Sequence, residues 1–144
     1  MALAGGVDLL TKRAVVASMH PFDRRVVVPG LLDLTYVQNP HGALGLFGDR
    51  PALLIALAAA VVAVLAYLVR DIVRRSALGQ IGFGFVVGGA TGNIVDRFVH
   101  HFVVDFIAPR GFYVFNLGDA FISVGITLVV LAGLFPSARA ADPA

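Results

Sequence analysis

Ala-Leu-Leu-Ile-Ala-Leu-Ala-Ala-Ala-Val-Val-Ala-Val-Leu-Ala-Tyr-Leu-Val (52–69) is an apolar run without a charge, a glycine or a proline. A transmembrane helix needs about 20 predominantly apolar residues, and Pro51 suits the first turn of such a helix. The 144-residue chain shares this character, being 58% hydrophobic and 14% charged, whereas soluble domains average about 25% charged residues. The sequence therefore predicts one integral membrane domain, with room for three or four spans and little else.

Arginines follow this run at once and set the expected orientation. Arg70, Arg74 and Arg75 lie in one short connection, and short Arg-rich loops stay on the cytoplasmic side of a membrane. Segment 95–116 then lies outside, and the polar tail 137–144 is predicted to be a disordered cytoplasmic end. The predicted spans are a partial first one over 1–17, followed by 52–69, 77–94 and 117–135.

The first predicted span is short because Asp8 and Lys12 interrupt it. Two explanations are open: the helix is genuinely short, or its start is truncated at Met1. A cleaved signal peptide is not expected here, because a sufficiently long apolar region is missing.

Segment 20–50 is too polar to span a membrane and is rich in β-branched residues. Val26–Val28 and Leu31–Val37 flank Pro29-Gly30, a pattern that predicts short strands around a turn. A second turn is predicted at Asn39–Gly42. We therefore expect an all-α polytopic membrane protein of about four transmembrane helices, with a small extracytoplasmic β-like platform.

The third predicted span is rich in glycine. Gly84, Gly88 and Gly92 share one helical face, and small residues at this spacing let transmembrane helices approach closely. Asn93 and Arg97 continue a neighbouring ridge. The polar end of this helix should therefore face a packed interface or a cavity rather than lipid.

Five carboxylate or amide side chains lie at the ends of apolar runs: Asn93, Asp96, Asp105, Asn116 and Asp119. A carboxylate at membrane depth is costly, so such residues usually face the protein interior and have a function there. Asp105 and Asp119 are separated only by a short connector. Paired carboxylates can share one proton and activate a water molecule, which points to a hydrolase acting at a membrane surface.

Simpler interpretations of these residues are also open. Asn116 is a plausible N-cap, and an acidic residue three positions later is most often part of helix capping. Asp96 and Arg97 could form a local ion pair at a helix end. Capping does not, however, account for Asp105 and Asp119 together with Asn93 and Arg97.

The sequence resembles the lipoprotein signal peptidases (signal peptidase II), a family of membrane aspartyl proteases with four transmembrane helices. The most specific motifs are Gly-Gly-Ala-Thr-Gly-Asn-Ile-Val-Asp-Arg (88–97), Val-Val-Asp-Phe-Ile (103–107) and Phe-Asn-Leu-Gly-Asp (115–119), with weaker ones at Asp8-x-x-Thr11-Lys12 and Asn39-Pro40. The resemblance extends from Asp8 to about Phe135. His41, His101 and Gly118 depart from the family pattern.

The resemblance implies an aspartic endopeptidase that removes signal peptides from diacylglyceryl-modified prolipoproteins, cutting before the lipidated cysteine. Asp105 and Asp119 would form its catalytic dyad. The residues expected to bind substrate or support the dyad are Asn93, Asp96, Arg97, Asn116, Asn39, Asp8 and Lys12. The implied setting is the bacterial inner membrane, where a multi-pass monomer would act among membrane lipids without a cofactor.

Two functions from other classes fit parts of the pattern. A non-catalytic homologue would bind the lipopeptide without cutting it, although both aspartates of the dyad are present. A small cation transporter could use Asp96, Asp105 and Asp119. Transport sites, however, lie near the membrane midplane, and these carboxylates lie at the ends of apolar runs.

Composition argues against several further classes. The net charge is only +2 and the chain has no cysteine, so we expect no nucleic-acid partner, no disulfide and no thiolate nucleophile. His100 and His101 are adjacent and do not share a helix face. No metal site is therefore predicted.

Overall fold

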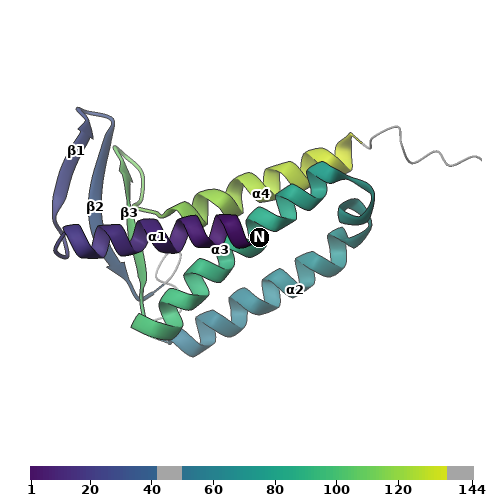
Figure 1. The fold of residues 1–144 in the computed structure, drawn as a ribbon, viewed down its shortest axis with the longest axis horizontal. Coiled ribbons are helices and arrows are strands. Elements are labelled where there is room, and N and C mark those ends of the chain that lie inside the picture. Colours follow the sequence, from purple (N-terminus) through teal and green to yellow (C-terminus); the bar gives the residue numbers. More distant parts are fainter. Residues whose placement is uncertain (42–49, 136–144) are drawn as a thin grey trace, which may run out of the picture.

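The computed structural model describes residues 1–41 and 50–135, which form four helices and a three-stranded sheet (Figure 1). The elements in chain order are α1 (Ala2–Ser18), β1 (Arg24–Val28), β2 (Leu32–Asn39), α2 (Pro51–Arg75), α3 (Ala77–His100), β3 (Val103–Pro109) and α4 (Leu117–Leu134). Predictions for the tail 137–144, and for the part of the platform within 42–49, fall outside the described residues.

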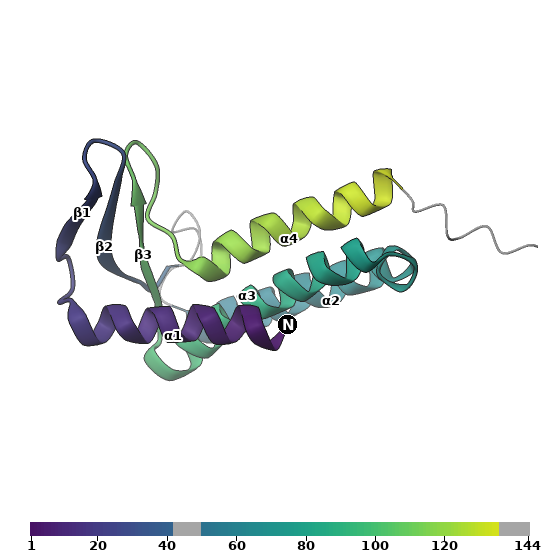
Figure 2. The same ribbon diagram turned by 45° about the horizontal axis from the view of Figure 1, so that its top comes forward.

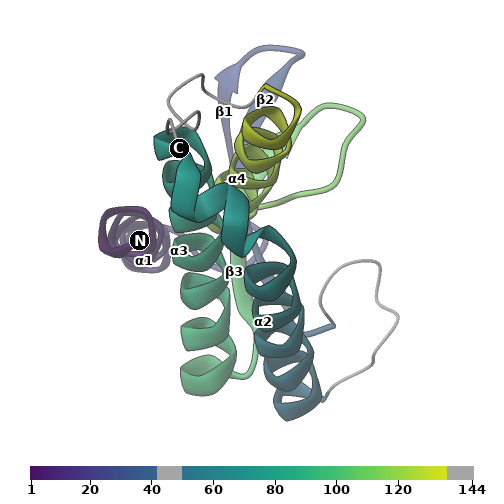
Figure 3. The same cartoon turned by 90° about the vertical axis from the view of Figure 1, so that its right-hand side faces the viewer.

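Helix α3 is the centre of the helical part and contacts each of the other three helices. Viewed along the bundle, α1 lies on one side of α3, and α2 and α4 lie on the other (Figure 3). The sheet stands at one end of the bundle, and the connection between α2 and α3 is at the opposite end (Figures 1 and 2). The predicted four-helix membrane fold with a small sheet is confirmed.

Glycines on α3 explain how closely its neighbours approach. A Cβ added at Gly88 would lie 2.7 Å from the Met1 carbonyl oxygen, and one at Gly82 would lie 2.7 Å from the Gly125 carbonyl oxygen. At Gly92 an added Cβ would collide with the Asp8 carboxylate. The predicted face of Gly84, Gly88 and Gly92 is thus the surface on which α1 packs, whereas Gly82 contacts α4.

Three helices of the described chain are long and apolar enough to cross a membrane: α2, α3 and α4. Helix α2 exposes most of its apolar side chains, including Val61, Val64 and Leu68, which are each more than half exposed. Such a surface would be unfavourable in water, so it is suited to contact with lipid. These helices make the protein a multi-pass membrane protein.

Helix α1 has two different environments along its length. Ala4, Asp8, Lys12 and Val15 are buried, and their spacing of three or four residues places them on one face. The first half of this face packs on α3. The second half packs beneath the sheet, where Val15 joins an apolar core made with Met19, Tyr36, Val104 and Phe106.

The sheet has the order β1-β2-β3 and is antiparallel throughout. Strands β1 and β2 form the hairpin predicted around Pro29-Gly30, and Gly30 has the positive φ of 75° that this turn requires. The third strand comes from far along the chain, with Val37 opposite Asp105 and Asn39 opposite Val103. The platform predicted within 20–50 is therefore completed by β3.

Helix α3 continues to His100, whereas the span was predicted to end at Ile94. The predicted ridge of Asn93 and Arg97 therefore lies within the helix, as does Asp96. The helix ends where His101 adopts the left-handed conformation, with φ of 66°. Glycine is the residue that most readily adopts this conformation, which explains why a histidine is unusual at this position.

Single-cysteine labelling tests the predicted orientation, because the chain has no cysteine of its own. Arg75→Cys and Phe112→Cys would each place one thiol at an exposed position, at opposite ends of the bundle. The predicted arginine-rich loop is in fact the last part of α2, and this end of the helix should remain in the cytoplasm. In intact spheroplasts, a membrane-impermeant maleimide should therefore label Phe112→Cys and not Arg75→Cys. Labelling of both variants after permeabilisation is the control, and the reverse pattern in intact cells would show the opposite orientation.

Candidate active site

Asp105 belongs to strand β3, at the end of the bundle that carries the sheet. It is 3% exposed, and both of its carboxylate oxygens accept hydrogen bonds from amides. Asn39 Nδ2 donates to Oδ2 at 2.8 Å, and Asn116 Nδ2 donates to Oδ1 at 2.6 Å. The antiparallel pairing of β2 with β3 brings Asn39 to this position from 66 residues away.

Asp119 lies in the first turn of α4, at the end of the helix next to the sheet. Asn93 Nδ2 donates to Asp119 Oδ1 at 2.8 Å, so α3 contributes one of its partners. The Asn116 backbone N–H approaches Asp119 Oδ2 at 3.4 Å. The helix N-terminus adds backbone dipoles that favour a negative charge at this place.

Asn116 joins the two aspartates. Its side-chain oxygen accepts from the Asp119 backbone N–H at 3.0 Å while its amide nitrogen binds Asp105. Asn116 and Asp119 also form the reciprocal capping box that starts α4. The Asn116 side chain therefore caps α4 and links the two aspartates at the same time. It is fully buried.

Burial raises the pKa of Asp105 to about 6, and the nearby Asp119 carboxylate acts in the same direction. The hydrogen bonds from Asn39 and Asn116, and the charge of Lys12, lower this pKa but do not cancel the effect of burial. Asp105 can thus hold a proton close to neutral pH, where an ordinary aspartate is ionised.

A buried ion cluster lies behind these residues. Lys12 Nζ is 2.7 Å from Asp8 Oδ2 and 3.1 Å from Asp96 Oδ2, and it donates to Asn93 Oδ1 at 2.8 Å. Asp8 Oδ1 accepts from the Gly118 N–H at 2.7 Å, and Asp96 Oδ2 accepts from the Val104 N–H at 3.1 Å. All three charged side chains are at most 5% exposed.

A cavity of about 580 Å³ opens in front of the two aspartates. Asp105 and Asp119 both line it, so their carboxylates face a common space. The other lining residues come from α3, α4, the two paired strands and the connection before α4: Asn39, Asn93, Arg97, Val103, Tyr113, Val114, Ile122 and Ser123. The cavity is large enough for a segment of peptide with its side chains.

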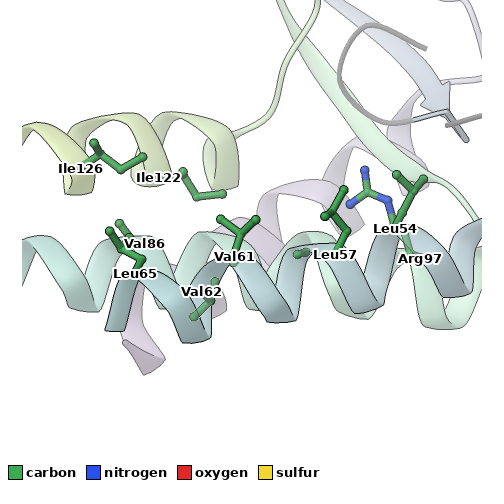
Figure 4. A pocket seen from close by; sticks show the side chains of 11 residues that line it. Leu54, Leu57, Val61, Val62, Leu65, Val86, Arg97, Ile122 and Ile126 are labelled. Carbon is green, nitrogen blue, oxygen red and sulfur yellow. The ribbon is translucent and has the colours of Figure 1, made fainter. Parts of the chain in front are cut away.

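An apolar groove of about 280 Å³ continues from this cavity along the bundle. In Figure 4, Ile122 and Ile126 of α4 lie across from Val61 and Leu65 of α2. Arg97 lies near one end of the groove and also lines the cavity. The groove and the cavity share Ile122 as well, so a ligand could occupy both at once.

The structure sorts the residues singled out in the sequence into two groups. Asn39, Asn93, Arg97, Asp105 and Asp119 line the cavity. Asp8, Lys12, Asp96 and Asn116 are buried behind it. Lys12 and Asn116 bind side chains of the first group, whereas Asp8 and Asp96 bind the backbone of the residues before Asp119 and Asp105.

Several lining residues were not predicted from the sequence. Tyr113 and Val114 belong to the connection before α4, whose aromatic side chains Phe112, Tyr113 and Phe115 pack on one another. An aromatic cluster next to a predicted site could have indicated them. The face of α2 that lines the groove carries no such signal, because its apolar residues look like those of any span.

No group of three or more histidine, cysteine, aspartate or glutamate side chains within 1–41 and 50–135 is arranged to hold a metal ion. His100 instead stacks on Phe102, with ring centroids 5.7 Å apart. The alternative ion pair of Asp96 with Arg97 is replaced by the ion pair of Asp96 with Lys12. The Arg97 guanidinium turns toward the backbone carbonyl of Asn93, at 3.4 Å.

Comparisons with known proteins identify the family of the chain. The family model for signal peptidase (SPase) II matches residues 1–135. A lipoprotein signal peptidase of Neisseria gonorrhoeae is 43% identical, covering 91% of this chain and 85% of the relative, and one of Trichormus variabilis is 37% identical over 89% and 82%.

Two solved structures described as bacterial membrane enzymes share the fold. The first has a TM-score of 0.84 at 23% identity, covering 99% of this chain and 90% of that one. The second has a TM-score of 0.81 at 24% identity, covering 94% and 90%. Since the family model extends over nearly the whole described chain, the protein belongs to the signal peptidase II family.

Proposed function

We propose that the protein is an aspartic endopeptidase that removes the signal peptide from diacylglyceryl-modified prolipoproteins, cutting before the lipidated cysteine. The observation that carries this proposal is the convergence of Asp105 and Asp119 on one cavity, with Asn116 bonded to both. The family supplies the substrate class, since the relatives are lipoprotein signal peptidases.

The two aspartates have different environments and therefore different roles. Asp105, whose pKa is raised to about 6 by burial, is the protonated partner. Asp119 at the start of α4 is the carboxylate that removes a proton from the attacking water. As the water oxygen bonds to the scissile carbonyl carbon, Asp105 gives its proton to the carbonyl oxygen. When the C–N bond breaks, the proton held by Asp119 passes to the leaving amine, and a hydroxyl proton of the tetrahedral intermediate returns to Asp105 as the new carboxyl group forms.

The remaining cavity residues position the peptide and its lipid. Arg97 Nε is buried and has no hydrogen-bond partner among the described residues, so a planar donor group is available to a substrate carbonyl or lipid ester. The apolar groove next to it would hold acyl chains or the apolar signal peptide, entering sideways from the bilayer. The lining aromatic Tyr113 would cover the peptide from the sheet side.

The position of the carboxylates separates this proposal from cation transport. Both aspartates lie next to the sheet, at the end of the bundle, and not halfway along the helices. The proposed setting is the bacterial inner membrane, with the sheet on its outer side and the protein acting as a monomer.

A cleavage assay tests the proposal directly. The purified protein should release the signal peptide from a diacylglyceryl-modified prolipoprotein. It should act far more slowly on the same precursor without lipid, which has no acyl chains to anchor it next to the cavity. Activity should survive dialysis against a chelator, because the proposed mechanism uses only carboxylates. Equal cleavage of both precursors would contradict the role of the lipid. Loss of activity on chelation, with recovery on adding zinc, would contradict the two-aspartate mechanism.

A further inference from the structure

The two carboxylates of the buried cluster make the same type of contact on opposite sides of the site. Asp8 binds the backbone N–H of Gly118, the residue immediately before Asp119. Asp96 binds the backbone N–H of Val104, the residue immediately before Asp105. The backbone just before each cavity aspartate, Asp105 or Asp119, is therefore held by a second aspartate that lies behind the cavity.

Lys12 connects these two anchors. Its ammonium group has three N–H donors and three acceptors within 3.1 Å: Asp8, Asp96 and the Asn93 side-chain oxygen. Asn93 in turn donates to Asp119. A single cation from α1 is thus connected to α3 directly, to α4 through Asp8, and to β3 through Asp96.

We propose that Lys12, Asp8 and Asp96 form a brace that sets the separation and orientation of the two catalytic aspartates, with Lys12 as the positioning residue. The inference rests on the proposed function, since it assigns the cluster a role toward that dyad. It goes further because none of the three side chains lines the cavity.

The brace also fixes the direction of the Asn93 amide. An ammonium group can only donate, so the oxygen of Asn93 must face Lys12 and its nitrogen must face Asp119. Without Lys12 no cation would bind the Asn93 oxygen. The amide could then rotate, and its oxygen would face the Asp119 carboxylate and repel it. The cation therefore keeps a hydrogen-bond donor directed at Asp119 Oδ1 without touching that residue.

The composition of the cluster favours a role in geometry over one in stability. Burying three charges has a large desolvation penalty, and well-packed apolar side chains are often as stable or more stable in such places. Here the charged groups hold two backbone N–H groups in different elements at defined distances. Apolar side chains could fill the same volume but could not fix these peptide groups.

Lys12→Met tests the brace, because it keeps an unbranched side chain only one atom shorter and removes the charge. We expect kcat on a lipidated precursor to fall about 100-fold, as a misplacement of about 1 Å can do, with KM changed less than about twofold. The pH profile should also move to higher pH, because the Lys12 charge is one of the influences that lower the pKa of Asp105. Other charged groups near Asp105 and Lys12 that contribute to the pH profile are Asp8, Asp96, Arg97 and Asp119.

Arg13→Met is the matched control, since Arg13 is the next residue on α1 and is exposed. It should leave kcat, KM and the pH profile unchanged. Asp8→Asn is the second variant: its one side-chain oxygen can accept from the Gly118 N–H or from Lys12 but not from both. It leaves the contacts of Lys12 with Asp96 and Asn93 in place, so it should lower kcat less than Lys12→Met does. A Lys12→Met protein that unfolds at the wild-type temperature and retains wild-type kcat would overturn the brace.

A second readout does not require activity. In an inactive Asp119→Asn background, the carboxyl carbon of Asp105 can be titrated by NMR, with and without Lys12→Met. The midpoint should rise by about one pH unit when the cation is removed. An unchanged midpoint would overturn the electrostatic part of the inference. If the wild-type protein cleaves no prolipoprotein, the proposed function fails, yet this titration still tests the brace.

Discussion

Asp105→Asn and Asp119→Asn should each reduce turnover of a lipidated prolipoprotein by about 10⁴-fold, the upper range for removing a general acid or base. An asparagine at position 105 has no proton to give to the carbonyl oxygen, and one at position 119 cannot accept a proton from water. Both substitutions preserve side-chain shape, and the loss should therefore appear in kcat. The measurement is single-turnover cleavage, combined with binding of a fluorescent lipopeptide.

Binding provides the control for this prediction. Neither substitution changes Arg97 or the apolar groove, so the affinity for the lipopeptide should stay within about threefold of the wild-type value. Substantial cleavage by either variant would show that the two aspartates do not act as a catalytic pair. Loss of binding with unchanged turnover of bound substrate would make them binding residues instead.

The stability of Asp105→Asn should depend on pH less than that of the wild-type protein. The pKa of Asp105 is about 6 in the folded protein and 3.8 ordinarily, so the folded state binds the proton more tightly. The wild-type protein accordingly loses stability as the pH rises from about 4 to about 6. Asparagine does not titrate, so the variant should gain up to about 3 kcal/mol relative to wild type over this interval. Thermal unfolding in detergent at pH 4 and pH 7 measures the difference.

Gly92→Ala should lower the free energy of unfolding by about 3–5 kcal/mol, the range for breaking a buried ion pair. The new Cβ would occupy the place of the Asp8 carboxylate. To make room, α1 must move away from α3, or Asp8 must leave both Lys12 and the Gly118 N–H. Activity should fall with stability, because Gly118 directly precedes Asp119.

Gly6→Ala is the matched control on the other helix of this contact. A Cβ at Gly6 meets no atom within 4 Å, and alanine favours a helix over glycine by about 1 kcal/mol. This variant should be as stable as wild type or slightly more so, with full activity. Equal effects of the two alanines would show that α1 does not pack against α3 as described.

Local sequence patterns were sufficient to predict the apolar helices and to single out Asp105 and Asp119, which line one cavity. An uninterrupted apolar run can only be a helix in lipid, because its backbone polar groups must be satisfied within the segment. Asn116 and Asp119 have the spacing of a capping box. The spacing of Gly84, Gly88 and Gly92 predicted a close helix contact, which α1 makes.

Contacts between distant parts of the chain could not be predicted in the same way. Asp8 binds a backbone N–H 110 residues away, and every residue except proline has such a group, so the side-chain sequence does not reveal the partner. Pairing of β3 with β2 likewise depends on the fold. Helix α3 extends beyond the predicted span to His100, since nothing in the sequence between Ile94 and His100 breaks a helix.

The capping box couples the folding of the first turn of α4 to the geometry of the site, because Asn116 takes part in both. When the first turn frays, Asn116 loses the Asp119 N–H that orients its amide, and the donor to Asp105 is lost with it. Hydrogen exchange at the Asp119 amide should therefore measure how often the resting enzyme is incompetent. A ligand that tightens this one turn would increase the competent fraction without touching either carboxylate.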